Sequence, residues 1–188
     1  IRGFFYRIGA RFNMEQIKDR WSKIKHKKNS RQQVDAIMTA CQHMSASKTG
    51  ALIVITKEQE LKSVVDTGEV VDAALSSRLI ENIFFKNTPL HDGALIVYNG
   101  RIWAAACILL VSKRSELPKL SGLRHRAALG LTEKTDALAI VVSEETGKIS
   151  IAQGDSIRTV NQNELENWLT QTFGIANEDK TAASNEIN

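Results

Sequence analysis

Residues 94–111 read ALIVYNGRIWAAACILLV. Two apolar, β-rich runs, 94–98 and 101–111, flank the dipeptide Asn99-Gly100, which favours a tight hairpin because both residues tolerate positive φ. Uninterrupted apolar runs of this kind are typical of strands that are covered on both faces. The stretch therefore predicts a β-hairpin in the buried part of a sheet.

Strand-like and helix-like segments surround this hairpin. Further buried strands are expected at residues 51–55, 137–143 and 148–152. Helices are expected at residues 31–45, 75–84, 123–134 and 161–173. Capping-box patterns at Ser30 with Gln33 and at Asn161 with Glu164 mark the starts of the first and last helices. The sequence predicts one α/β domain, with a central mixed sheet of about five to seven strands and helices on both faces.

Length and composition fit a single domain that is stable without disulfides or a structural metal. The chain has 188 residues, 43% apolar and 24% charged, and a domain of this size buries about two-thirds of the surface that its unfolded form exposes. No apolar run reaches the roughly 18 to 20 residues of a membrane-spanning helix. Cys41 and Cys107 lie in apolar surroundings, so we expect reduced core thiols in a cytosolic protein.

The positive charge is concentrated at the start of the chain. Residues 1–31 contain ten Lys or Arg and two acids, whereas the other 157 residues contain fifteen basic and nineteen acidic side chains. Apolar residues recur between these charges at helical spacing, so we interpret residues 1–30 as a basic amphipathic segment. Such a segment suits a juxtamembrane helix, a solvated linker helix or a nucleic-acid-binding arm; we expect no nucleic-acid partner. A folded domain is expected over 31–174 and a disordered tail over 175–188.

A carboxylate and a glycine stand directly before the strand expected at 94–98. Asp92 suits metal binding or the polarisation of a hydroxyl, and Gly93 lets the backbone approach a ligand closely. The same pair also fits an ordinary Asp-Gly turn. His91 fits a hydrogen-bonded turn residue or a metal ligand.

Two further stretches carry charges that packing alone does not explain. Arg124-His-Arg126 begins a helix, where cations oppose the positive end of the helix dipole unless an anion is bound between them. The same run also fits an ordinary solvated helix end. Ser143-Glu-Glu145 follows a buried strand, where acids suit a metal ligand and a nucleotide contact or an acidic hairpin turn. Ligands gather at strand ends in α/β sheets, so we expect the three stretches to form a metal-assisted site for a phosphorylated ligand. The chain has no P-loop, Rossmann glycine motif or Gly-x-Ser-x-Gly elbow.

These motifs resemble those of diadenylate cyclase (DAC) domains, the bacterial synthases of cyclic di-AMP. The resemblance covers about residues 31–173 and rests on Asp92-Gly-Ala94, Arg124-His-Arg126 and Ser143-Glu-Glu145. It implies that two ATP molecules condense into cyclic di-AMP with loss of two pyrophosphates, assisted by Mg²⁺, Mn²⁺ or Co²⁺. It also implies a homodimer of face-to-face protomers, each holding one ATP. A catalytically silent module that binds ATP or cyclic di-AMP is the alternative.

The resemblance also implies roles for single residues. Asp92 would bind the metal and activate the 3′-hydroxyl, and Leu109 would offer its backbone to adenine. The implied metal ligands are Asp92, His91 and Glu145. The implied catalytic residues are Asp92, Gly93, Arg124, His125 and Arg126. The implied nucleotide-binding residues are Asp92, Gly93, Ala94, Leu109, Gly122, Leu123, Arg124, His125, Arg126, Ser143 and Glu144.

Two positions depart from the family pattern. Many members have Thr where this chain has Leu123, and some have Tyr beside adenine where it has Ile108; we expect altered affinity rather than lost activity. The segment before Arg31 resembles the linker of the membrane-anchored class, whose transmembrane helices would precede Ile1. The chain is therefore expected to be the cytoplasmic catalytic fragment of a plasma-membrane protein, soluble as given.

Overall fold

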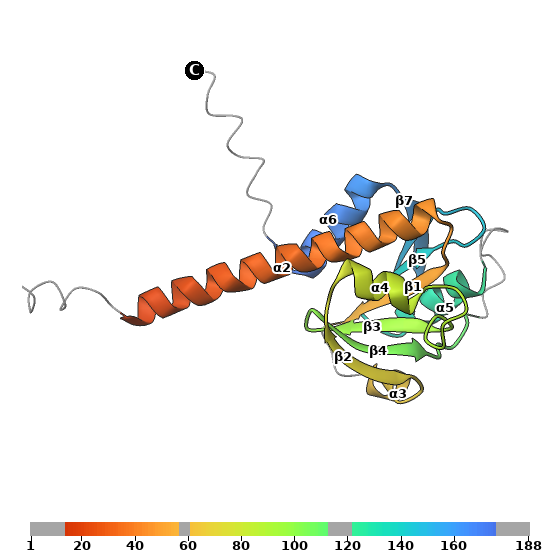
Figure 1. Ribbon diagram of the computed structural model, residues 1–188, viewed down its shortest axis with the longest axis horizontal. Helices are drawn as coiled ribbons and strands as arrows, with labels where there is room; N and C mark the ends of the chain where they lie inside the picture. The colour runs from red at the N-terminus through yellow and green to blue at the C-terminus, as the bar shows by residue number, and fades with distance from the viewer. Residues whose placement is uncertain (1–13, 57–60, 113–121, 176–188) are drawn as a thin grey trace, which may run out of the picture.

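The computed structural model describes residues 14–56, 61–112 and 122–175, with side chains from residue 30 onward (Figure 1). The helices are α2 (Met14–Ala46), α3 (Lys62–Val65), α4 (Ser77–Ile83), α5 (Leu123–Thr132) and α6 (Gln162–Thr172). The strands are β1 (Ala51–Thr56), β2 (Glu69–Ala74), β3 (Ala94–Tyr98), β4 (Arg101–Cys107), β5 (Leu138–Val142), β6 (Ile149–Gln153) and β7 (Ser156–Val160).

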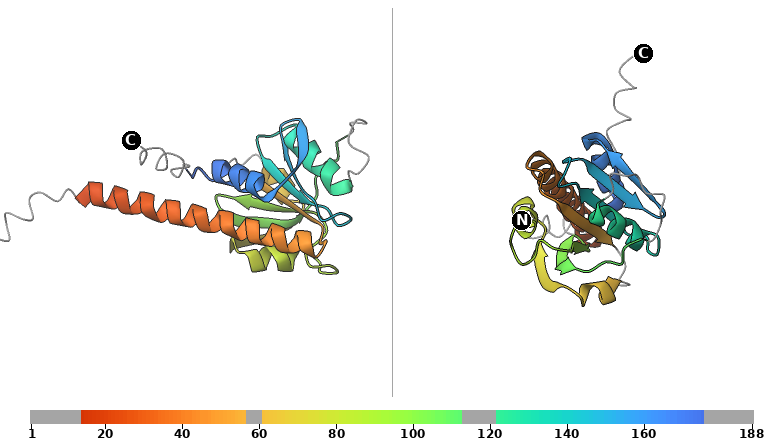
Figure 2. Two further views of the ribbon diagram at one scale, coloured as in Figure 1. Left: turned by 90° about the horizontal axis from the view of Figure 1, so that it is seen from above. Right: turned by 90° about the vertical axis from the view of Figure 1, so that its right-hand side faces the viewer.

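The seven strands form one mixed sheet in the order β2-β4-β3-β1-β5-β6-β7. β1 and β3 are parallel neighbours, and the other neighbouring pairs are antiparallel. α2 runs beside α4 and α6 on one face, whereas α3 and α5 cover the other (Figure 2). The predicted mixed sheet with helices on both faces is confirmed.

The sheet separates two apolar cores because successive side chains of a strand point to opposite faces. In β1, Ile53 belongs to the core that includes residues of α2, α4 and α6, whereas Leu52 and Val54 belong to the core that includes residues of α3 and α5. Every residue of β1 and β5 is buried. This double coverage explains why the central strands are continuous apolar runs.

The predicted hairpin is confirmed, but its second strand is shorter than expected. Asn99 and Gly100 have φ values of 49° and 69°, which suits a tight turn. β4 ends at Cys107 rather than at residue 111. Ala106 has a positive φ of 55°, where the ladder with β3 is irregular, and the chain then passes against α5. The apolar residues after Cys107 therefore belong to a connection and not to the sheet.

Helix α2 also differs from its predicted start near residue 31. It is continuous from Met14 to Ala46, and the position of Ser30, predicted to cap the helix, lies inside it. Neither Gly nor Pro occurs in this stretch, and Lys, Gln and Arg favour helix, so no residue interrupts it at Ser30. The N-terminal part of α2 projects away from the sheet (Figure 1).

Both cysteines are buried thiols, as predicted. Burial raises the pKa of Cys41 to about 12 and that of Cys107 to about 11. Within the described ranges, no helix combines the length and apolar character needed to cross a bilayer. The predicted disordered tail falls almost entirely on residues 176–188, and the start of the basic segment falls on residues 1–13; both lie outside the described residues.

Candidate active site

Four strand ends meet at one edge of the sheet. β1 and β3 begin there, directly after Gly50 and Gly93, while β4 and β5 end there. The register fixes this arrangement, because Ala51 pairs with Val142 and Ala94 pairs with Cys107. Adjacent strands lie about 4.8 Å apart, so the ends of β3 and β5 are separated by roughly 10 Å across β1. The stretches at Asp92 and at Ser143 therefore share one edge, as the sequence predicted.

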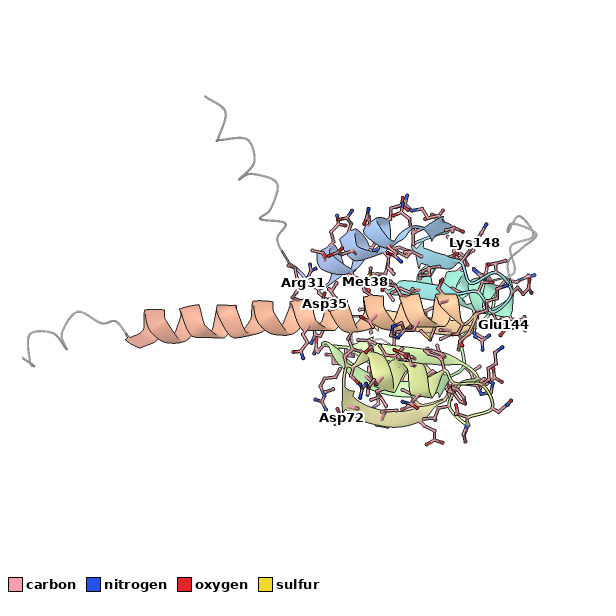
Figure 3. All side chains as sticks on the ribbon, turned by 45° about the horizontal axis from the view of Figure 1, so that its top comes forward. Arg31, Asp35, Met38, Asp72, Glu144 and Lys148 are labelled. Atoms are coloured by element: carbon pink, nitrogen blue, oxygen red, sulfur yellow. The ribbon has the colours of Figure 1, made fainter. Side chains whose placement is uncertain are left out.

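Arg124, in the first turn of helix α5, lies at this edge. The Arg124 guanidinium donates through Nη1 to Oε2 of Glu144 at 2.8 Å. The Arg124 side chain is 23% exposed and the Glu144 side chain is 58% exposed, so the pair lies at the surface with its cationic half mostly covered. Figure 3 shows Glu144 at the end of the domain opposite to the projecting part of α2. The second and third stretches are thus in direct contact.

His125 lies half-buried beside the turn at residues 143–147, which we call the acidic turn because it carries Glu144 and Glu145. Burial lowers the pKa of His125 below its ordinary value of 6.5, while the negative charge of Glu145 acts in the opposite direction. Desolvation is the larger effect, so the imidazole is neutral at neutral pH. His125 therefore offers one N–H donor between two permanent cations rather than a third positive charge.

The second arginine ties α5 to the segment that follows β4. Arg126 donates from Nη2 to the Ser112 carbonyl at 3.2 Å, and the Ser112 N–H donates to the Arg126 carbonyl at 2.9 Å. In this segment, Leu109 is 8% exposed and packs into the core, so only its backbone is left for a ligand. Ile108 is 68% exposed and lies next to it.

Each of the two arginines has a donor without an acceptor in the part of the chain that the structure describes. Nε of Arg124 and Nε of Arg126 are buried and lack a hydrogen-bond partner among the described residues. The N–H groups of Leu123 and Arg124 form the first turn of α5, where no carbonyl of the same helix can accept them. The Gly122 N-cap provides no side chain to cap them. An anion at this position would satisfy several donors at once.

Asp92 and His91 lie in the turn before β3. No described residue forms a hydrogen bond or ion pair with the exposed Asp92 carboxylate. His91 Nδ1 lies 2.6 Å from the Thr88 carbonyl oxygen. A carbonyl can only accept, so Nδ1 carries the proton and Nε2 of the neutral ring keeps its lone pair. His91 is therefore both a turn residue and a possible metal ligand.

Gly93 has a packing role that the sequence did not indicate. Its φ is +121°, and a Cβ there would lie 2.7 Å from the Ala106 carbonyl carbon and 2.8 Å from the Cys107 carbonyl oxygen. The glycine thus allows β3 to begin against the bent end of β4. Ala94, the next residue, is fully buried in β3, which leaves only its backbone near the edge.

Helix α2 holds the acidic turn by a hydrogen bond. Ser45 Oγ donates to the Gly147 carbonyl at 2.6 Å, and Gly147 adopts a positive φ of 73°. Within the turn, the Gly147 N–H donates to the Ser143 carbonyl and the Thr146 N–H to Ser143 Oγ. These bonds orient the segment that carries Glu144 and Glu145.

Sequence reasoning missed several supporting residues, among them Gly50, Ser45 and Ser112. Their contacts join segments far apart in the chain, and a local motif carries no signal of such contacts. No described hydrogen bond or ion pair links Asp92 to α5 or to the acidic turn. The structure places these groups on one edge of the sheet without a described contact between Asp92 and the other two stretches.

The donor set does not form a closed metal cage. Among the described residues, no three His, Cys, Asp or Glu side chains lie together so that they could hold a metal ion. Mg²⁺ and similar ions are commonly held by one or two carboxylates together with substrate phosphates. Asp92, whose carboxylate has no partner among the residues described, and His91 Nε2 fit such a shared site.

A family model described as "DAC: DisA bacterial checkpoint controller nucleotide-binding" matches residues 38–157, which include all three stretches. The chain belongs to the DAC family. The seven-stranded sheet is thus the form that the DAC fold takes in this chain.

Named relatives agree with this membership. The chain is 48% identical over 124 residues to the diadenylate cyclase CdaS of Bacillus thuringiensis, covering 66% of this chain and 62% of that protein. It matches the crystal structure of a DacA double mutant from Staphylococcus aureus with a TM-score of 0.75 and 37% identity, over 78% of this chain and 98% of that one. A structure from Bacillus cereus, described as a hypothetical membrane spanning protein, matches with a TM-score of 0.65 and 47% identity, over 68% of this chain and 62% of that one.

The DAC-family relatives are longer than the matched region. Across the curated relatives that are 43 to 48% identical, the chain spans 50 to 62% of their length.

Proposed function

We propose that this chain is a diadenylate cyclase that condenses two ATP molecules into cyclic di-AMP and two pyrophosphates. The observation that carries the proposal is the edge where Arg124 and Arg126 each have a buried donor without a partner in the described part of the chain, on the same sheet edge as the acidic turn and Asp92. Membership of the DAC family and the relatives named diadenylate cyclase support the same activity.

The first task of the site is to hold triphosphate. Arg124 uses Nη1 for Glu144, and its buried Nε has no partner among the described residues, so we assign its remaining donors to phosphate oxygens. Arg126, the neutral His125 and the free N–H groups of α5 add further donors. The backbone at Leu109 and the exposed Ile108 side chain would meet the adenine, with Ile108 packing on its face. Leu123 is 77% exposed at the start of α5, next to the bound phosphates.

The second task is to align and activate the nucleophile. The 3′-oxygen of one ATP attacks the α-phosphorus of the other, the bond to the bridging oxygen of the β-phosphate breaks, and pyrophosphate leaves. Asp92, whose carboxylate is unpaired within the described part of the chain, accepts the hydroxyl proton. A second attack in the reverse sense closes the ring. Alignment and charge neutralisation supply most of the acceleration.

A divalent cation fits beside Asp92 and His91. Bound there with substrate phosphates, Mg²⁺, Mn²⁺ or Co²⁺ would neutralise charge that develops on the phosphoryl oxygens. Glu145, exposed in the acidic turn, is the third candidate ligand. Because no three such side chains lie together among the described residues, substrate oxygens would complete the coordination. Ser143 and Glu144 contact the nucleotide in this arrangement.

The active unit is a pair of protomers facing each other across this edge. One site holds one ATP, and the attacked α-phosphate belongs to the ATP of the partner, so a single protomer binds without cyclising. The apolar side chains of Ile108, Leu110 and Leu123 are 68 to 77% exposed around the site and are available to the second copy and its nucleotide.

The parent protein is anchored in the bacterial plasma membrane, with this chain on the cytoplasmic side. The basic residues 1–30 suit the cytoplasmic flank of a membrane span. The membrane-spanning description of the Bacillus cereus relative supports this placement.

Incubation of the purified chain with ATP and Mn²⁺, followed by chromatography against a cyclic di-AMP standard, tests the proposal. We expect cyclic di-AMP and pyrophosphate as the products. ATP binding without product under Mn²⁺, Mg²⁺ and Co²⁺ would instead identify a silent nucleotide-binding module.

A further inference from the structure

Gly50 lies beneath the Arg124–Glu144 ion pair at the start of β1. A Cβ at Gly50 would lie 2.6 Å from Arg124 Nη1, 2.8 Å from Glu144 Oε2 and 3.1 Å from Arg124 Cζ. Separations below 3.0 Å essentially never occur around a real Cβ. The ion pair therefore occupies the space that any side chain at position 50 would fill.

The backbone on both sides of Gly50 is fixed. Thr49 donates its N–H to the Met44 carbonyl at 2.8 Å, and Ala51 pairs with Val142 in the sheet. Gly50 itself is buried and its φ lies outside the positive range. Alanine is thus compatible with the backbone, and an added methyl group would displace the ion pair rather than the strand.

The displaced atoms are the ends of two flexible side chains. Such ends move at little cost in folding free energy, in contrast to Gly93 and Gly130, whose neighbours are backbone atoms. A methyl group at position 50 would consequently change the place of the guanidinium more than the stability of the domain. Among the glycines of the site edge, Gly50 is the one whose Cβ would meet functional side chains.

We infer that Gly50 is a positioning residue: its missing side chain creates the slot in which Glu144 orients the Arg124 guanidinium toward bound phosphate. This inference rests on the proposed function, because it assigns ATP phosphate as the ligand of Arg124. Gly50 touches neither substrate nor metal and acts through Arg124.

The test is a titration of ATP binding by Gly50→Ala, with thermal unfolding measured alongside. We expect ATP affinity to fall by about ten- to a hundredfold, the effect of misplacing one charge-assisted hydrogen bond, while the unfolding midpoint stays close to that of the unmodified chain. Gly154→Ala is the matched control. Gly154 has a φ of +56° in the β6–β7 turn and open space around it, so alanine there lowers the midpoint and leaves ATP affinity unchanged.

A second background separates positioning from a general structural effect. In Glu144→Ala the Arg124 guanidinium no longer has its carboxylate partner and has more room to move. Adding Gly50→Ala to this variant should therefore weaken ATP binding by at most about threefold relative to Glu144→Ala alone. An equal loss in both backgrounds, or unchanged ATP affinity of Gly50→Ala, overturns the inference.

These results also separate the inference from the proposed function. A chain that binds ATP with the expected Gly50 dependence and forms no cyclic di-AMP overturns the proposed function alone. A chain that forms cyclic di-AMP with equal ATP affinity and rate in Gly50→Ala overturns the positioning role alone. Absence of ATP binding by the unmodified chain overturns both.

Discussion

Asp92 and Arg124 contribute in different ways to the candidate active site. Arg124 is held by Glu144 at 2.8 Å and is mostly covered, whereas Asp92 is exposed and unpaired within the described residues. A held cation suits a binding role, because its position is set before the ligand arrives. An unpaired carboxylate suits proton transfer or a shared metal, because its lone pairs are not already engaged.

Asp92→Asn separates these two roles. We expect ATP affinity close to that of the unmodified chain and a rate of cyclic di-AMP formation at least about a hundredfold lower, because the amide cannot accept the hydroxyl proton. Calorimetric titration and chromatography of the product measure the two quantities. Asp136→Asn is the control, since Asp136 precedes β5 at the opposite edge of the sheet. Undiminished turnover by Asp92→Asn would remove this residue from the mechanism.

His125 gives the stability of the domain a defined pH dependence. Its pKa is lowered by burial from an ordinary 6.5, so below that pH the unfolded chain binds a proton that the folded chain does not. The contribution of this residue to stability is therefore complete above about pH 6.5 and declines as the pH falls through the lowered pKa.

The corresponding comparison is between the unmodified chain and His125→Gln. We expect the unmodified chain to lose more free energy of unfolding between about pH 7.5 and pH 5.5, by at most about 1.4 kcal/mol per pH unit for one proton. Urea unfolding at both pH values measures it. His43 and His91 are present in both proteins, so their contributions cancel in the difference between the two chains. Parallel pH profiles of the two chains would contradict the lowered pKa.

At the scale of elements, α2 connects distant parts of the domain. Where α2 enters the domain, Arg31 forms an ion pair with Glu166 of α6 at 2.8 Å. Arg31 also pairs with Asp35, four residues further along the same helix (Figure 3). Further along, Gln33 donates to the Gly100 carbonyl in the β3–β4 hairpin, and His43 pairs with Glu81 of α4 at 3.0 Å. At its C-terminal end, Ser45 holds the acidic turn of the site. One helix thus joins the N-terminal segment to the turn that carries Glu144 and Glu145.

Ser45→Ala tests whether this last contact positions the turn. Loss of a partly buried hydrogen bond should cost about 1 kcal/mol of unfolding free energy and slow cyclic di-AMP formation several-fold, because the acidic turn loses its attachment to α2. Ser47→Ala is the matched control: within the described residues its hydroxyl bonds only His43, Met44 and Thr49, all in the α2–β1 region. Stability assays and initial rates distinguish them. A similar loss of rate in both variants would show that the Ser45 bond has no special effect on the site.

The elements that sequence patterns predicted are those buried on both faces. β1, β5 and the β3–β4 hairpin have unbroken apolar runs because helices cover the sheet on each side. The edge strands β2 and β7 were not predicted, since most of their residues are exposed and β2 is broken by a positive φ at Asp72. Their pairing with β4 and β6 makes them strands, and that pairing is not visible in their own sequence.

The residues of the candidate site also fall into two groups, those that the sequence predicted and those that it did not. The residues of the three stretches were predicted because their charges conflict with simple packing, as Arg124 does at the start of α5. Gly50 and Ser45 were not predicted because their roles depend on segments about 75 to 100 residues away. Long-range geometry, rather than residue type, determines which neutral residues support the charged ones.

At the scale of the whole molecule, an acidic domain is expected to bind a polyanion. Outside the first 31 residues, acids outnumber Lys and Arg by nineteen to fifteen. The local positive field at the start of α5 favours polyanion binding more than the net charge opposes it, because Arg124, Arg126 and the positive end of the helix dipole lie together there. This edge lies at the end of the domain away from the projecting part of α2, so a second protomer can approach the site from that end (Figure 3).

The decisive measurement for the paired-site mechanism is the rate of cyclic di-AMP formation per protomer, at saturating ATP and Mn²⁺, over a dilution series of the chain. In the proposed mechanism two sites that each hold one ATP meet before the ring closes, so the rate per protomer should rise with protein concentration and level off once the pair is formed. A rate per protomer that is independent of concentration down to the lowest measurable protein level, or the absence of cyclic di-AMP at every concentration, would contradict the account.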